Sequence, residues 1–68
     1  MKYRWQCGTN NKIYYILSII DEGKVTLTFH GTDRTIVNEA EISSNGWIVG
    51  KGFMLPPLDN PKWKQVED

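Results

Sequence analysis

Hydrophobic and polar residues alternate along much of this chain. In residues 2–7 every second side chain is apolar, and residues 24–30 repeat the same alternation. A period of two is typical of a β-strand with one buried and one solvent-facing side. The positions predicted to face inward in these two segments are Tyr3, Trp5, Cys7, Val25, Leu27 and Phe29.

Two further segments depart from simple alternation. Residues 12–20 are apolar at both parities and rich in β-branched and aromatic side chains, which favours a long, bent strand covered on both faces rather than a buried helix. In Thr35–Ile42, Ile36, Ala40 and Ile42 share a strand face, although a helix would also bring Ile36 next to Ala40. We expect a strand here.

Turn residues mark the rest of the chain. Asn45-Gly46 predicts a two-residue hairpin of type I′, a turn that needs positive φ at both central positions. A fifth strand is expected over Trp47–Leu55, where Gly50 and Gly52 indicate a bulge, a sharp bend or the close approach of another backbone.

The C-terminal segment follows Pro56-Pro57, which cannot continue a hydrogen-bonded ladder. Asn60-Pro61 has the pattern of a helix N-cap followed by proline at the first helical position. We therefore expect a short helical turn over Pro61–Val66.

Together these elements predict one all-β domain over residues 1–68. Five short strands with short connections favour a small antiparallel barrel or rolled sheet, SH3-like or OB-like, ending in the short C-terminal helical turn. A chain of this size buries only about 60% of its unfolded surface, so its large aromatic side chains are needed for the core.

The charge balance and the cysteine content limit the possible partners and the cellular location of the domain. Eight basic and eight acidic residues cancel, so the net charge gives no long-range attraction to nucleic acid or anionic lipid. A single cysteine, Cys7, is typical of a reducing compartment, and a cytoplasmic location is expected. The first residues lack the apolar core of a signal peptide, and the apolar run 13–20 is shorter than a membrane span.

Few residues suggest catalysis or metal binding. His30, on the wet face, lacks an evident nucleophile, while inward-facing Cys7 lacks a thiolate-stabilising neighbour in the pattern. Glu39 and Glu41 lie on one side of a predicted strand. Carboxylates in that arrangement also serve to prevent edge-to-edge pairing with another sheet, so they do not by themselves indicate a catalytic pair. Lys51 stands between two glycines without the longer spacing of a phosphate loop. We expect no catalytic site, metal site or cofactor.

The aromatic residues and the lysines near them are the main candidates for function. Exposed aromatic rings anchor protein partners well, and rings beside lysines also suit unpaired bases. The primary hypothesis is a noncatalytic protein-binding module, a small regulator, adaptor or inhibitor, with a second copy of the chain as a further candidate partner. A single-stranded nucleic-acid binder is the alternative, and an enzyme or a subunit of a shared active site is the third hypothesis. The predicted partner-binding residues are Tyr14, Trp47, Lys51, Lys62, Trp63 and Lys64.

Overall fold

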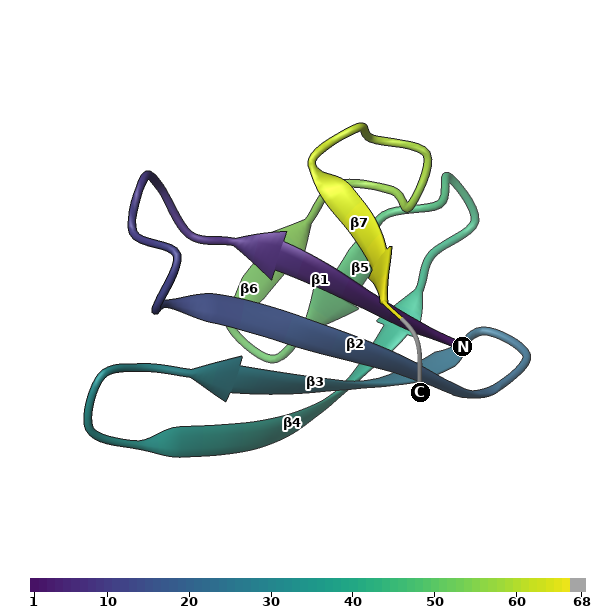
Figure 1. Ribbon diagram of the computed structural model, residues 1–68. Helices are drawn as coiled ribbons and strands as arrows, with labels where there is room; N and C mark the ends of the chain where they lie inside the picture. Colours follow the sequence, from purple (N-terminus) through teal and green to yellow (C-terminus); the bar gives the residue numbers. More distant parts are fainter. Residues whose placement is uncertain (67–68) are drawn as a thin grey trace.

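The computed structural model describes residues 1–66, which form one antiparallel β-sheet and no helix (Figure 1). The sheet has seven strands in the order β6-β5-β4-β3-β2-β1-β7. It curls into a half-barrel, with the β3–β4 hairpin extending beyond it. The all-β prediction is confirmed, whereas the count of five strands is wrong. The strands are β1 Lys2–Gln6, β2 Tyr14–Asp21, β3 Lys24–His30, β4 Thr35–Ile42, β5 Ile48–Gly50, β6 Phe53–Leu55 and β7 Trp63–Val66.

The core lies on the concave side of the sheet. Leu17 of β2 pairs with Leu27 of β3, and both side chains are fully buried. Alternation places Val25 beside them, as the sequence predicts. Full burial of an aliphatic side chain of this size contributes about 1.5–3 kcal/mol, so these few residues account for much of the stability. The buried apolar residues are Leu17, Val25, Leu27, Ala40, Ile48 and Trp63.

Strand β2 differs from its prediction on the convex side. Tyr15 packs against the core, but Tyr14 and Ile16 on the opposite face are only half-buried, and Ile20 is 63% exposed. The expected cover on both faces is therefore incomplete. A β-bulge between Ile19 and Asp21 leaves Ile20 without a paired residue on β3, so its side chain is pushed outward.

The segment Thr35–Ile42 is strand β4, as predicted, and it leads into a hairpin with β5. The turn is not type I′, because Asn45 does not have a positive φ. Instead, the N–H of Gly46 donates to the carbonyl of Ser43, and Gly46 alone is left-handed, with φ of 90°. This is the pattern of a longer hairpin loop that ends in a glycine.

The predicted single strand Trp47–Leu55 is two strands. β5 and β6 are joined by a tight turn at Lys51-Gly52, where Gly52 has a φ of 83°. Gly50 pairs with Phe53 across this hairpin. The glycines thus mark a reversal of the chain rather than a bulge within a single strand.

The expected helical turn over Pro61–Val66 is wrong, since Trp63–Val66 forms strand β7 and pairs with β1. Asn60 does cap a turn: its Oδ1 accepts from the N–H of Lys62, and its carbonyl accepts from the N–H of Trp63. The same capping pattern can open a helix or a single turn. Here the residues after the turn pair with the free edge of β1 and so become a strand of the sheet.

Candidate functional site

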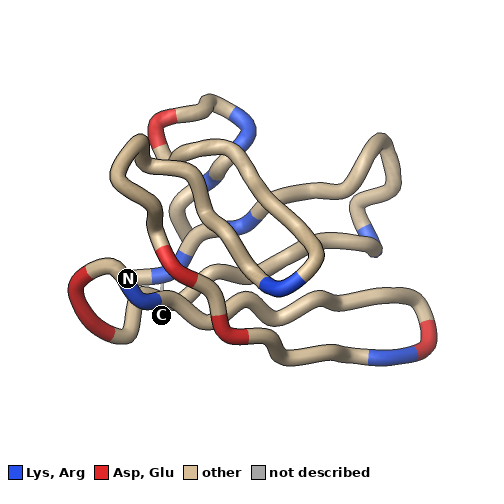
Figure 2. Tube along the Cα trace, turned by 180° about the vertical axis from the view of Figure 1, so that it is seen from behind, with Lys and Arg blue, Asp and Glu red and all other residues tan. Residues whose placement is uncertain are grey.

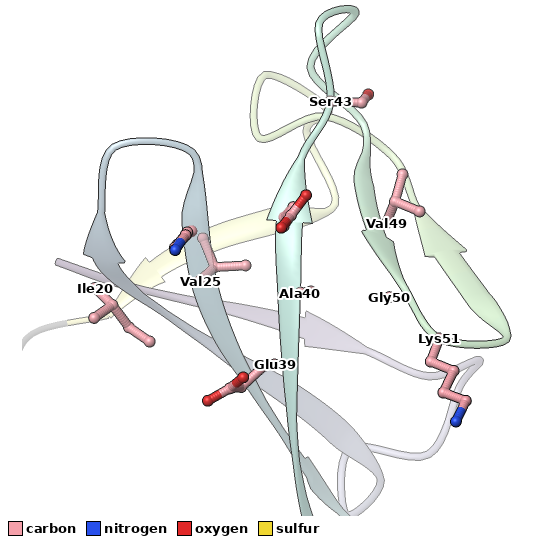
Figure 3. A pocket seen from close by; sticks show the side chains of 10 residues that line it. Ile20, Val25, Glu39, Ala40, Ser43, Val49, Gly50 and Lys51 are labelled. Carbon is pink, nitrogen blue, oxygen red and sulfur yellow. The ribbon is translucent and has the colours of Figure 1, made fainter.

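Two grooves mark the surface of the domain, and the first lies over β3, β4 and β5 (Figure 3). It is open to solvent and has a volume of about 740 Å³. Ile20, labelled in Figure 3, is one of its lining residues and lies at the bulge of β2. The residues lining it are Ile20, Lys24, Val25, Glu39, Ala40, Glu41, Ser43, Val49, Gly50 and Lys51.

Apolar side chains are unusually open at this first groove. Val49 is 40% exposed, and its cross-strand partner Met54 on β6 is 60% exposed. On its other side Val49 pairs with Glu41, which in turn pairs with Lys24. The groove therefore combines an apolar stretch with charged residues of both signs.

The second groove lies between the end of β1 and the segment that leads into β7. It has a volume of about 360 Å³. Arg4 and Lys64 are direct cross-strand partners along it, and Lys62 places its Nζ 5.7 Å from the centre of the Trp5 ring. Among residues 1–66 no acidic residue lines this basic groove, whose lining is Arg4, Gln6, Gly8, Pro61, Lys62 and Lys64.

A stack of three side chains continues from the basic groove across the convex face. The guanidinium carbon of Arg4 lies 4.3 Å from the centre of the Tyr14 ring. The ring of His30 stacks on Tyr14 at 4.7 Å with an angle of 21° between the planes. An Arg4 Nη2 also donates to the carbonyl of Asn11 at 2.6 Å, which helps to hold the guanidinium in place.

The predicted partner-binding residues do not form one site. Lys62 and Lys64 line the basic groove and Lys51 lines the first groove, while Tyr14 belongs to the stack. Trp63 is only 6% exposed and belongs to the hydrophobic core. Its indole Nε1 donates to the carbonyl of Pro56 at 2.9 Å.

Trp47 is half-buried next to the β4–β5 turn, where its N–H donates to Asn45 Oδ1 at 3.3 Å. It lines neither of the two grooves.

No family model, curated protein or solved structure matches this chain.

Several residues that line or adjoin these grooves are not predicted by the pattern of the sequence. Ile20 and Val49 are apolar, and the alternation of residues within their own segments does not predict that they are exposed. The bulge that exposes Ile20 arises only when β2 pairs with β3. Arg4 is not among the predicted site residues, because its position opposite Lys64 follows only from the pairing of β1 with β7.

The candidate chemical groups are dispersed. Glu39 and Glu41 line the first groove, whereas His30 lies at the far end of β3 in the aromatic stack. Burial raises the pKa of the half-buried Cys7 thiol above its ordinary value, which lowers its thiolate fraction. Within residues 1–66, no three His, Cys, Asp or Glu side chains gather as a metal site would require. The same part of the chain has no helix with the length and apolar character to cross a membrane.

Proposed function

We propose that the chain is a noncatalytic binding module, a small regulator, adaptor or inhibitor, that holds a segment of a partner protein in the first groove. The observation that carries this proposal is the exposure of two apolar side chains that line the groove, Ile20 and Val49, with the exposed Met54 paired to Val49 on the neighbouring strand. A small domain has few apolar residues to spare for its surface, so an exposed apolar group beside a groove favours an interface.

The groove suits an extended peptide with apolar side chains. Full burial of side chains such as Ile20 or Val49 contributes about 1.5–3 kcal/mol each, which makes them candidate anchors. Glu39 and Lys51 stand at the border of the groove, where polar residues commonly surround the apolar centre of an interface. A segment with apolar residues flanked by charges of either sign would match this arrangement.

The distance between the candidate catalytic groups supports the proposal that the module is noncatalytic. His30 pairs with Thr35, and Glu39 pairs with Thr26, so three residue pairs separate them along the β3–β4 ladder. At the rise of a β-strand, the two side chains begin roughly 13 Å apart. A general base and a carboxylate at that separation do not act on one reacting atom.

We also infer a relationship to small SH3-like barrels rather than to OB-like ones, and a cytoplasmic location. Consecutive strands are neighbours from β1 to β6, and only β7 returns to β1, whereas an OB-fold has Greek-key connections. The single free cysteine supports the reducing compartment.

Selection from a displayed library of short random peptides tests the proposed function. Peptides selected on the wild-type chain should share an apolar motif and should lose affinity by about tenfold or more for Ile20→Glu or Val49→Glu. Val37→Glu is the matched control, since Val37 is 64% exposed on β4, close to the 63% of Ile20, and does not line the groove. Recovery of no common motif, or an equal loss with Val37→Glu, would refute the assignment of this groove.

A further inference from the structure

The basic groove brings three cationic side chains together at the edge of the sheet. Arg4, Lys62 and Lys64 border it, and no acidic residue of the described part of the chain, 1–66, belongs to its lining. Arg4 has a single hydrogen bond through Nη2, and its buried Nε has no partner in the structure. The buried Nε is closed to a ligand, so the remaining Nη hydrogens are the donors that Arg4 offers to a further acceptor, and the adjoining lysines add positive charge.

Charge is separated across the sheet even though the chain is neutral. The strands β1 and β7 carry Lys2, Arg4 and Lys64 and no acidic residue, while β4 carries Glu39 and Glu41 and no basic residue. In Figure 2 blue and red segments lie next to each other in several loops, so the separation of charge concerns these strands and not the loops. Although the net charge of the chain is zero, β1 and β7 therefore carry a local excess of positive charge.

Aromatic side chains continue this positive surface. Tyr14 is contacted by Arg4 and by His30, so the half-exposed His30 ring ends the stack. The line from Lys64 through Arg4 and Tyr14 to His30 crosses β7, β1, β2 and β3, which are neighbours in the sheet. Four adjacent strands span roughly 14 Å.

We propose that this strip binds single-stranded nucleic acid, with Arg4, Lys62 and Lys64 contacting phosphates and His30 stacking on a base. This inference goes beyond the protein-binding groove and uses different residues. An acidic peptide would need only the cations, whereas a nucleic acid uses both a cationic track and an adjacent ring platform. The presence of both features on one strip favours the nucleic acid.

Fluorescence anisotropy with a labelled thymidine oligonucleotide, titrated at several salt concentrations, tests the proposal. Binding should weaken steeply as salt rises, because each phosphate contact releases counterions and contributes about 0.7 to the logarithmic slope for a single strand. Undetectable binding at low salt, or an affinity that does not depend on salt, would overturn the proposal.

Lysine variants locate the phosphate contacts. The Lys62→Gln and Lys64→Gln double variant should lose about tenfold in affinity at low salt, and its salt slope should fall by about 1.4. The matched control is Lys24→Gln with Lys51→Gln, which removes the same charge from the first groove. An equal loss in the control would show that net charge, not this groove, binds the oligonucleotide. Lys64→Glu, at one exposed position, provides a second test if the double variant folds poorly.

Substitution of His30 separates stacking from charge. At a pH where the imidazole is neutral, His30→Ala should weaken oligonucleotide binding severalfold while leaving the salt slope unchanged. His30→Phe should restore much of the affinity, because an aromatic platform returns. Displacement of the oligonucleotide by polyglutamate at equal charge concentration, with no effect of His30→Ala, would assign the groove to acidic proteins instead. The peptide selection on the first groove is independent of all these outcomes.

Discussion

The ring of Phe53 covers Gly50, its cross-strand partner in the β5–β6 hairpin. A Cβ atom at Gly50 would overlap three carbons of that ring. Phe53 also faces Tyr15, with their ring centres 6.5 Å apart and an angle of 19° between the planes. The missing side chain at Gly50 therefore lets the short edge hairpin fold its aromatic ring down onto the core.

Gly50→Ala should destabilise the domain by about 1–3 kcal/mol, because the Phe53 ring must move off its packed position. Chemical denaturation of wild type, Gly50→Ala, Phe53→Ala and the double variant measures the coupling between the two residues. The alanine at position 50 should cost much less once the ring is gone. An equal cost in both backgrounds would show that the ring is not the obstacle.

Trp63 is predicted to contribute to folding rather than to first contact with a partner. Trp63→Ala should cost about 3–5 kcal/mol, since it empties a site in the core. Trp63→Phe should cost less, because it keeps a ring but loses the hydrogen bond to the Pro56 carbonyl. Lys64→Ala, at the next and exposed position, is the control and should change stability by less than about 0.5 kcal/mol. Thermal and urea unfolding measure all three, and a stable Trp63→Ala variant would contradict this role.

Local alternation was sufficient to predict some of the fold. Val25 and Leu27 are buried where the period of two places them. In β4 the same period buries Ala40, whereas Ile36 on that face is 40% exposed. Strand β7 was missed because Asn60-Pro61 is compatible with either a helix start or a turn. The choice is made by the unpaired edge of β1, which is more than fifty residues away in the sequence.

The candidate sites were predicted less well, for a related reason. Lys62 and Lys64 are both among the predicted partner-binding residues, but Arg4 joins them only through the pairing of β1 with β7. The exposure of Ile20 depends on a bulge, which is a mismatch in length between two paired strands. Alternation within a segment reports the face of each residue. It does not report which strands become neighbours.

The β4–β5 turn gives a prediction about glycine. Gly46 has a φ of 90°, so Gly46→Ala should destabilise the domain by about 1–2 kcal/mol. Asn45 is not left-handed, but its Oδ1 accepts from the Ser43 hydroxyl and from the Trp47 N–H. Asn45→Gly should therefore also destabilise the turn, contrary to what a type I′ turn would predict. Urea denaturation measures the free energy of unfolding of both variants. An Asn45→Gly variant that is more stable than the wild type would support a type I′ turn instead.

Stability should fall at alkaline pH because of Cys7 and Tyr15. Burial raises the pKa of both groups, and the Cys7 thiolate further raises that of Tyr15. The folded chain therefore holds these protons more tightly than the unfolded chain, which ionises first as the pH rises. The free energy of unfolding should be unaffected by these groups near neutral pH and should decline from about pH 8.5, the ordinary thiol pKa, upward.

Urea denaturation under reducing conditions, at about pH 7 and about pH 10, measures this decline. Cys7→Ala removes one titrating group and the charge that acts on Tyr15, so its stability should fall less between the two pH values than that of the wild type. Tyr15→Phe isolates the phenol. Each substitution also changes packing at every pH, so the quantity compared is the difference between the two pH values within one variant. Identical alkaline losses in the wild type and both variants would show that neither buried group is responsible.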